Sequence, residues 1–274
     1  MSAGPAASVE LARRIRCDVL RMVHRARASH VGTCFSIADI LAVLYAEALR
    51  IDPHDPGRAT RDRLLLSKGH GGAALYAVLA ERGFFPSAWL DEYCADGSRL
   101  AGHATHHQVP GVEVSTGSLG HGLPLGCGMA LAAQRDGSPA RTFVILSDGE
   151  CDEGSTWEAA LFAPHHRLDN LVAIVDYNKI QSFGSVAQVL DLAPLAEKWR
   201  AFRWAVTEID GHDHAALARA LGTVPTEAGR PTALIAHTVK GKGVSFMEGD
   251  LAWHYRSPSD EQLAAALAEL GDAP

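Results

Sequence analysis

The sequence predicts an α/β fold in which helices flank a doubly wound, mostly parallel sheet. Its clearest unit lies mid-chain, where two apolar, β-rich runs, Phe143–Leu146 and Leu171–Val175, enclose a segment with helical spacing, Glu153–His165. Strand, helix and strand in this order indicate a parallel unit, because two parallel strands need a long crossover between them. Strand-like and helix-like segments continue to alternate along the chain, which favours one doubly wound sheet.

The first half of the chain predicts two helices, a strand and a long loop. Apolar residues recur at helical spacing over Val9–Ala28, and Ser36 and Asp39 resemble a capping box that begins a second helix. The other elements expected here are a charged loop at Asp52–Asp62, a buried strand at Leu64–Leu66, a turn at Gly69–Gly72 opening a helix through Leu79, and an irregular segment at Leu100–Gly122. A long irregular segment in a compact domain is often functional.

The helix expected at Gly120–Gln134 carries many small residues, so it is either a central helix of the domain or a subunit-interface helix. The later elements expected are a helix at Leu190–Arg200, a strand at Trp204–Ile209, a turn and helix cap at Asp210–Asp213, a strand at Thr232–Thr238 and an amphipathic helix at Asp260–Leu270. No repeat or linker interrupts this order, so we expect residues 1–274 to form a single domain.

Composition excludes several classes of protein. The net charge of −7 argues against binding to nucleic acid or to an anionic membrane surface. The five cysteines are scattered and contain no C-x-x-C pair, which argues for a reducing compartment and against zinc. The N-terminus lacks the apolar core of a signal peptide, and the longest apolar run, Leu123–Ala133, is too short to span a bilayer. We therefore expect a cytoplasmic protein.

Two polar residues follow the strands of the central unit. Asp148 comes after the first strand and Asn178 after the second, and the carboxyl ends of parallel strands meet at one edge of the sheet. A carboxylate, an amide carbonyl and the backbone carbonyl of Ile180 are oxygen ligands that suit Mg²⁺ on a diphosphate, with Ca²⁺ or Mn²⁺ as substitutes. Gly149 would let the chain approach the phosphates closely. In isolation, Asp-Gly is also a common turn.

Several motifs in this order resemble those of the transketolases, a family of thiamine diphosphate-dependent enzymes. They are Ser29–Gly32 (SHVG), Ser67–His70 (SKGH), Gly102-His103, Ser115–Gly122 (STGSLGHG), Asp148–Glu150 (DGE), Tyr177–Ile180 (YNKI), Thr238–Gly243 (TVKGKG) and Trp253–Tyr255 (WHY). The resemblance covers residues 10–270 and implies the thiamine diphosphate-binding fold. It is strongest to the N-terminal, diphosphate-binding subunit of a split transketolase. Ser147 and Tyr177 depart from the family's usual Gly and Asn.

The resemblance implies roles for individual residues. Asp148, Asn178 and the Ile180 carbonyl would hold the metal. The residues implied at the cofactor, besides Asp148 and Asn178, are His70, Gly149, Glu150 and Lys240 around the diphosphate, and Gly117, Ser118 and Leu119 along the cleft. His30 and His103 would touch the hydroxyls of the donor ketose, and His254 would lie near the reacting carbons. Glu153 and Glu158 resemble an acidic relay between paired sites.

From the residues alone, some of these positions have simpler interpretations. His70 suits either a phosphate at a helix N-terminus or a helix cap, and His30 suits a loop histidine. His106 and His107 have no carboxylate or cysteine at metal-ligand spacing, so we interpret them as surface or supporting residues. Histidines that contact substrate would suit proton transfer, because their pKa lies near neutrality.

The resemblance also implies a partner. In the family a second domain binds the aminopyrimidine ring and supplies the glutamate that activates the cofactor. Only 20 residues (274 − 254) follow His254, so we expect this domain on a C-terminal, pyrimidine-binding subunit, with two copies of each chain and a sugar or sugar-phosphate substrate. The family commonly reads Trp-His-Gly-Lys where this chain has Tyr255 and Arg256 after His254, which leaves the ketose donor and the aldose acceptor open.

Three alternatives remain at this point. The chain resembles, more weakly, a 2-oxoacid dehydrogenase alpha subunit or deoxyxylulose phosphate synthase. It also fits a biosynthetic, transketolase-like enzyme that uses a non-standard ketose. A non-enzymatic remnant of the fold is a further possibility, against which the intact Asp148, Asn178, His70 and His103 argue.

Overall fold

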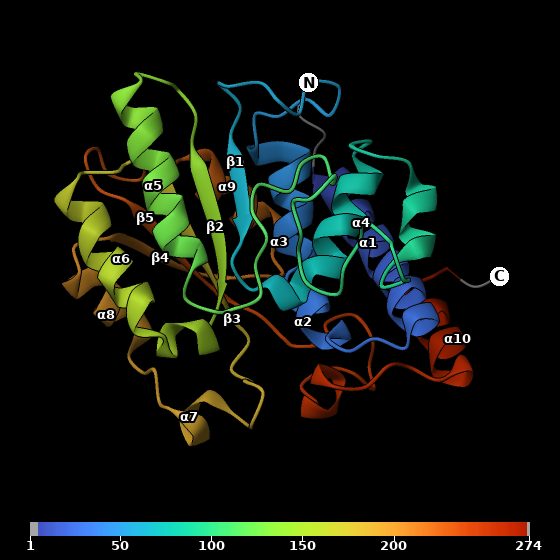
Figure 1. Ribbon diagram of the computed structural model, residues 1–274. Coiled ribbons are helices and arrows are strands. Elements are labelled where there is room, and N and C mark those ends of the chain that lie inside the picture. Colours follow the sequence, from blue (N-terminus) through green and yellow to red (C-terminus); the bar gives the residue numbers. More distant parts are fainter. Residues whose placement is uncertain (1–4, 273–274) are drawn as a thin grey trace.

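The computed structural model, which describes residues 5–272, is built around one five-stranded sheet (Figure 1). The strands are β1 (Arg63–Leu66), β2 (Thr142–Ser147), β3 (Leu171–Tyr177), β4 (Ala205–Asp210) and β5 (Thr232–His237), in the order β1-β2-β3-β5-β4. Every neighbouring pair is parallel. The prediction of a doubly wound α/β fold is confirmed.

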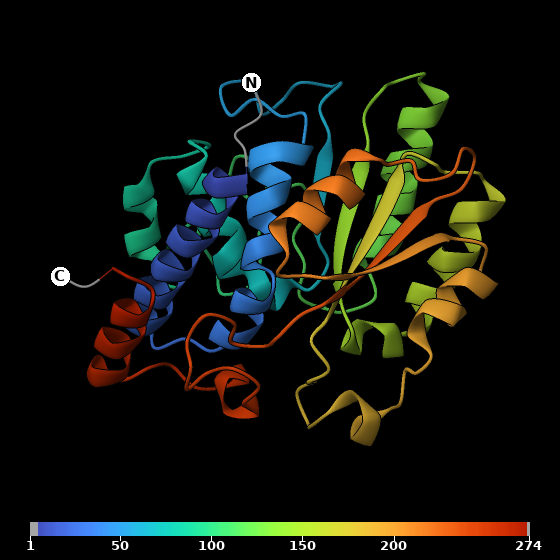
Figure 2. The same cartoon turned by 180° about the vertical axis from the view of Figure 1, so that it is seen from behind.

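Helices cover both faces of the sheet (Figures 1 and 2). One face carries α1 (Pro5–Ala26), α3 (Ala38–Val43), α4 (Gly72–Glu81) and α9 (His214–Gly222), and the other carries α5 (Gly122–Arg135), α6 (Gly154–His165) and α8 (Leu195–Ala201). Successive side chains of a strand point to opposite faces. Ile145 and Ile174 therefore pack into the first core, and Val144 and Val175 into the second. Burial on both faces explains why these strands read as continuous apolar runs.

The remaining helical segments are short or lie near the chain ends. They are α2 (Val31–Ser36), η1 (Leu44–Ala48), η2 (Gly69–Gly71), η3 (Ser87–Glu92), η4 (Gly149–Asp152), α7 (Val186–Val189), η5 (Leu251–His254) and α10 (Asp260–Glu269). The expected irregular segment between residues 100 and 122 contains no helix or strand until α5 begins at Gly122. Asp213 accepts a hydrogen bond from the Ala216 N–H, so it caps α9 as the sequence predicts.

Two local predictions are wrong. Ser36 ends α2 and does not begin a helix: its hydroxyl donates to Asp176 (2.7 Å) and lies 2.9 Å from the Thr33 carbonyl, while Asp39 forms a buried ion pair with Arg16. The predicted helix at Leu190–Arg200 starts only at Leu195, after Pro194. Proline has no N–H to donate and restricts the residue before it, so a helix cannot run through this position undisturbed.

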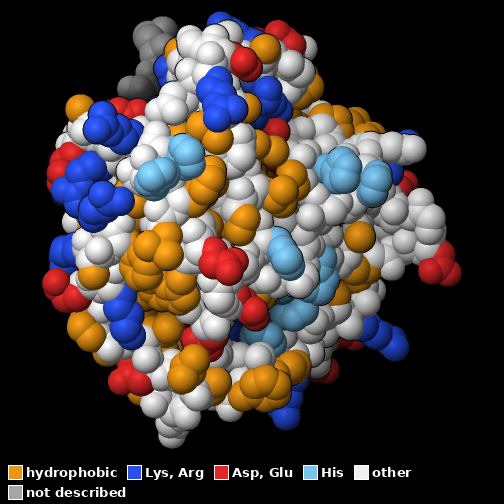
Figure 3. All heavy atoms as spheres, turned by 60° about the vertical axis from the view of Figure 1, so that its left-hand side comes forward, with side chains coloured by type: hydrophobic (Ala, Val, Ile, Leu, Met, Phe, Trp, Pro, Cys, Tyr) orange, Lys and Arg blue, Asp and Glu red, His pale blue; other side chains and the backbone are white. Residues whose placement is uncertain are grey.

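The surface has a hydrophobic area on the face that carries α5 and α6 (Figure 3). Leu125, Leu161 and Phe162 are exposed there. Within residues 5–272, no helix is both long enough and apolar enough to cross a membrane. All five cysteines are unpaired.

Candidate active site

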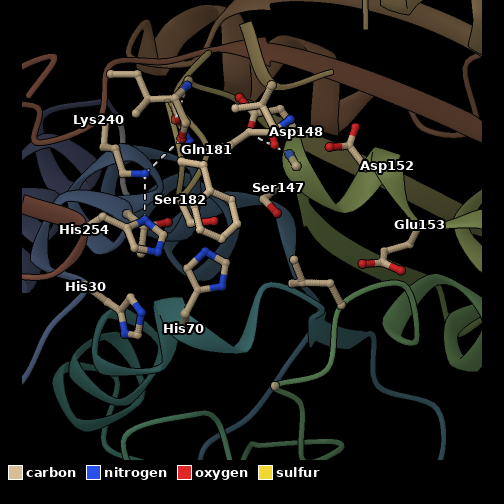
Figure 4. Close-up of a pocket in the computed structure, with 18 of the residues that line it drawn as sticks. His30, His70, Ser147, Asp148, Asp152, Glu153, Gln181, Ser182, Lys240 and His254 are labelled. Carbon is tan, nitrogen blue, oxygen red and sulfur yellow. Dashed lines mark hydrogen bonds between the residues drawn. The ribbon is translucent and has the colours of Figure 1, made fainter. Parts of the chain in front are cut away.

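A cavity of about 380 Å³ lies at the carboxyl ends of the strands, where ligands bind in open α/β sheets (Figure 4). Most of the residues singled out from the sequence line it: His30, His70, His103, Gly117, Leu119, Asp148, Gly149, Glu153, Asn178, Ile180, Lys240 and His254. They come from segments far apart in the chain, so the fold converts separate motifs into one site.

Three of the predicted site residues do not line this cavity. Glu150 is buried beneath it, where its carboxylate accepts hydrogen bonds from the Ser67 hydroxyl and the Gly120 N–H. Ser118 is an exposed residue of the loop that precedes α5. Glu158 lies on α6 beside a separate groove that Cys127 and Phe162 also line. Glu150 thus anchors the loop before α5 to the end of β2.

The metal-competent residues lie together because β2 and β3 pair in register, with Ser147 opposite Asp176. Asp148 Oδ1 accepts a hydrogen bond from the Gly149 N–H (2.7 Å), and Oδ2 accepts one from the Lys179 N–H (2.6 Å). Burial, together with the nearby Asp176 carboxylate, raises the pKa of Asp148 to about 6. A cation at this position would offset that unfavourable burial of negative charge.

The donor set fits a hard divalent cation. Asp148, Asn178 and Ile180, which all line the cavity, carry a carboxylate, a side-chain amide oxygen and a backbone carbonyl. Mg²⁺ needs further oxygen ligands, which a diphosphate and water would provide. Within the part of the chain that the structure describes, His, Cys, Asp and Glu side chains form no group of three or more suited to metal binding. The arrangement therefore suits a metal that is shared with a phosphorylated cofactor.

Four histidines surround the other part of the cavity. The ring centroid of His30 lies 5.5 Å from that of His70, 5.6 Å from that of His103 and 5.1 Å from that of His254. Burial and nearby cationic groups lower the pKa of His30 to about 4 and that of His254 to about 3, so both rings are neutral at pH 7. A neutral imidazole can both donate and accept a hydrogen bond.

Backbone geometry and Lys240 hold this cluster in place. His30 adopts a left-handed conformation (φ 77°), and its N–H donates to the His254 carbonyl (3.1 Å). The Lys240 ammonium lies 3.0 Å from His254 Nδ1 and donates to the Ile180 carbonyl (2.9 Å). Burial and the neighbouring Lys68 lower the pKa of Lys240 to about 8. Lys240 thus connects the histidines to the proposed metal ligands.

Sequence reasoning missed a buried network beneath the site. Lys68 and Asp176 form an ion pair with no side-chain exposure, and Lys68 also donates to the Thr33 carbonyl (3.2 Å). Asp176 accepts further hydrogen bonds from Ser36 (2.7 Å), Asn178 (3.0 Å) and Thr238. Burial by itself would raise the pKa of the Asp176 carboxyl. The Lys68 ammonium and the hydrogen bonds from Thr238 and Ser36 outweigh burial and hold this pKa below its usual range. The sequence did contain one sign of this network: Asp176 is a carboxylate inside the otherwise apolar strand β3.

The cavity wall also includes residues that the sequence did not single out. They are Thr33, Ser147, Asp152, Gln181, Ser182, Phe183 and Val189. Four of them belong to the chain that follows β3, where no periodicity or motif distinguishes a lining residue from a surface one.

Replacing Lys68 with methionine should lower the free energy of unfolding by about 3–5 kcal/mol, because it leaves the buried Asp176 without its cation. Chemical denaturation of the two proteins measures the difference. Lys242→Met is the matched control, since it removes a half-exposed surface pair with Glu248 and should cost at most about 1 kcal/mol. Equal losses in the two variants would contradict a structural role for the buried pair.

Comparisons with known proteins agree with this geometry. Residues 7–274 match the family described as "Transketolase, thiamine diphosphate binding domain". The chain is 46% identical over 256 residues to the 6-deoxy-6-sulfo-D-fructose transketolase subunit SqwG of Clostridium sp. (strain MSTE9), covering 93% of each chain. It is 41% identical over 257 residues to a subunit of the apulose-4-phosphate transketolase of Phocaeicola vulgatus, covering 94% of this chain and 91% of that one.

Solved structures give the same result. The transketolase of Leishmania mexicana superposes with a TM-score of 0.91 at 32% identity, covering 97% of this chain and 42% of that one. The Pichia stipitis transketolase in complex with sedoheptulose 7-phosphate gives a TM-score of 0.93 at 29% identity, covering 98% and 41%. The chain thus spans about two-fifths of the length of these solved transketolases. The chain belongs to the transketolase family: residues 7–274 match its thiamine diphosphate-binding domain, and the chain corresponds to an N-terminal subunit of a split transketolase.

Proposed function

We propose that this chain is the diphosphate-binding half of a two-chain, Mg²⁺-dependent transketolase, which transfers a two-carbon ketol unit from a ketose, or ketose phosphate, to an aldose. The observation that carries the proposal is the single cavity that joins the oxygen donors of Asp148, Asn178 and Ile180 to four histidines. A metal-diphosphate site and a proton-transferring site lie side by side, as this reaction needs.

At the end of the cavity near the β2 and β3 strand ends, Mg²⁺ would be held by Asp148, Asn178 and the Ile180 carbonyl, with Ca²⁺ or Mn²⁺ as substitutes. His70, Lys240 and Gly149, which all line the cavity, would lie beside the diphosphate, and Gly117–Leu119 would flank the cofactor. Gly149 begins the short helix η4, and its N–H donates to the Asp148 carboxylate. Bound thiamine diphosphate supplies the nucleophilic carbon and the electron sink for ketol transfer.

At the other end, His30, His103 and His254 would bind the donor's hydroxyl groups and exchange protons with them. Their rings line the cavity close together, and the neutral rings of His30 and His254 can each donate and accept a hydrogen bond. Because their pKa values are lowered to about 4 and about 3, these two rings are weaker proton acceptors than an ordinary histidine. Glu153 lines the same cavity, whereas Glu158 faces the groove beside α5. We propose that this acidic pair connects two sites through a contact between subunits.

The second half of the cofactor site would come from a C-terminal, pyrimidine-binding subunit, with two copies of each chain. Three similar relatives are named as transketolase subunits, two of them of apulose-4-phosphate transketolases. The exposed Leu125, Leu161 and Phe162 on α5 and α6 supply an apolar surface for association. We also propose a cytoplasmic location, which the unpaired cysteines support and which cell fractionation would test.

The substrate is proposed as a class only. The relatives named above act on 6-deoxy-6-sulfo-D-fructose and apulose 4-phosphate, so a non-standard ketose is as compatible with this chain as xylulose 5-phosphate. Pyruvate belongs in the same screen, because its use would favour the deoxyxylulose phosphate synthase or 2-oxoacid dehydrogenase alternatives.

The purified chain alone should transfer no ketol unit and bind the cofactor weakly, because the pyrimidine ring would face water. Adding the pyrimidine-binding chain should restore both properties, since burying the cofactor between two surfaces couples binding to assembly. The assay contains thiamine diphosphate, Mg²⁺ and xylulose 5-phosphate with ribose 5-phosphate, with and without the partner. Substantial turnover by the single chain would refute the two-chain proposal. Inactivity of the mixture would redirect the search to the other ketoses.

A further inference from the structure

Tyr255 connects two segments whose residues line the cavity. Its hydroxyl donates a hydrogen bond to the Ser182 carbonyl at 2.6 Å, and its ring centroid lies 4.8 Å from that of His254. Ser182 and His254 both line the cavity. Tyr255 itself is 56% exposed, so it bridges its two partners from the solvent side. The contact spans 73 residues of sequence, and the sequence pattern gave no sign of it.

The two connected segments differ in how firmly they are held. The η5 segment is fixed by several contacts: the His30 N–H donates to the His254 carbonyl, and the buried Trp253 donates its Nε1–H to the Phe246 carbonyl at 3.0 Å. The loop after β3 projects from the sheet and has Phe183 at 85% exposure. The loop is closed on itself by an antiparallel bridge between Ile180 and Ser185 and by the hydrogen bond from the Gln181 N–H to the Gly184 carbonyl at 2.8 Å. Tyr255 therefore attaches a projecting loop to a fixed support.

A second contact between the same segments lies deeper. Lys240 donates to the Ile180 carbonyl and contacts His254, so the base of the loop is fixed independently of Tyr255. Loss of the Tyr255 hydroxyl would detach the tip of the loop at Ser182 from the support, while the backbone contacts at the base of the loop and the proposed metal ligands stay in place. Loss of this hydroxyl should therefore alter the contacts that Ser182 and Phe183 make with a substrate, and leave binding of the diphosphate unchanged.

We propose that Tyr255 is a positioning residue that fixes the loop Gln181–Gly184 against the histidine cluster and thereby limits the size of the donor ketose. This inference rests on the proposed ketol transfer. The reacting end of the donor would lie among the histidines, and the remainder of its carbon chain would extend along the wall that Ser182 and Phe183 form. A fixed wall discriminates between donors by their chain length, whereas a mobile wall also accepts longer donors.

The functional test uses Tyr255→Phe, which keeps the ring beside His254 and removes only the hydroxyl. The assembled enzyme is assayed with xylulose 5-phosphate, fructose 6-phosphate and sedoheptulose 7-phosphate, each with glycolaldehyde as acceptor, so that erythrulose is the product in every case. Loss of one hydrogen bond should change the ratio of kcat/KM between the shortest and longest donors about threefold to tenfold, in favour of the longest. The change should lie in KM, with kcat for the preferred donor within about twofold.

The matched control is Tyr45→Phe, the same chemical change at a buried tyrosine of η1, far from the loop in the sequence and outside the cavity. It should leave the ratio unchanged. Equal ratios in Tyr255→Phe and the wild type would overturn the proposal. Absence of ketol transfer by the wild type from these three donors and from the non-standard ketoses would overturn the proposed function and, with it, the role in donor size.

A second measurement tests the contact without any substrate or cofactor. Hydrogen exchange of the amides from residue 181 to 189 should become about threefold to tenfold faster in Tyr255→Phe, while exchange in β2 stays the same. Tyr45→Phe should show neither change. Unaltered exchange in the loop would refute the positioning role even if the enzyme is an active transketolase. Faster exchange with unchanged donor ratios would refute the effect on donor size.

Discussion

Replacing Asp148 with alanine should abolish metal-dependent binding of thiamine diphosphate while the fold stays intact. The variant removes the only carboxylate among the proposed oxygen ligands, and water cannot replace its charge. Because changes even in the second shell of a metal site cost about 10–100-fold in affinity, loss of this ligand should raise the dissociation constant by at least about 100-fold. Asp148 follows the end of β2, so the ladder between β2 and β3 does not depend on its side chain.

Calorimetric titration of the assembled enzyme with thiamine diphosphate, with Mg²⁺ and with a chelator, measures this effect. Asp148→Asn keeps nearly the same shape and removes the negative charge; its single amide oxygen can accept only one of the two hydrogen bonds, from the Gly149 N–H or from the Lys179 N–H. Asp136→Asn is the control, because Asp136 is exposed just past the end of α5, outside the cavity. Wild-type affinity in Asp148→Ala would overturn the assignment of the metal site. Thermal unfolding of the same samples checks the fold.

The sheet was predictable from the sequence because its signal is local. Each central strand is buried on both faces and therefore reads as a short apolar run, and each crossover carries a helical pattern. Register then follows: once β2 and β3 are parallel neighbours, the residues after them must meet at one edge. The proximity of Asp148 and Asn178 was predictable for this reason.

The surroundings of the site were less predictable because they depend on contacts between distant segments. Ser36 has the local sequence of a helix cap, but a hydrogen bond to Asp176, 140 residues away, takes its hydroxyl instead. Lys68 lies next to predicted site residues, yet nothing local shows that it pairs with Asp176 inside the core. Glu150 follows Gly149 in the chain and still points under the cavity. In each case a long-range partner decided where a polar side chain lies.

The histidine cluster was predicted from the family resemblance and not from local sequence patterns. Motif positions predicted a common site for His30, His70, His103 and His254, although spacing alone left loop and cap interpretations open for two of them. The structure places all four rings around one cavity. A left-handed residue at His30 and the hydrogen bond from its N–H to His254 create this arrangement, and neither can be read from the sequence.

Replacing His103 with alanine should lower turnover far more than cofactor affinity. Its proposed role is to bind the reacting end of the donor ketose and to exchange protons with it, which is typically worth about 10²–10⁴-fold in rate. The backbone at this position should survive the change, because the Tyr76 hydroxyl donates to the His103 carbonyl at 2.9 Å independently of the imidazole. His103 lies on a different loop from Asp148 and Asn178, so the dissociation constant of thiamine diphosphate should change by less than about threefold.

Steady-state kinetics and cofactor titration of the assembled variant separate the two quantities. His106→Ala provides the control within the same loop, because the His106 ring is exposed, contacts Ser115 (2.8 Å) and lies outside the cavity. It should retain nearly full turnover. A His103→Ala enzyme that binds cofactor poorly yet turns over fully at saturation would place His103 at the diphosphate and not at the donor. Equal losses in the two variants would instead indicate that the loop as a whole, and not the His103 imidazole, supports turnover.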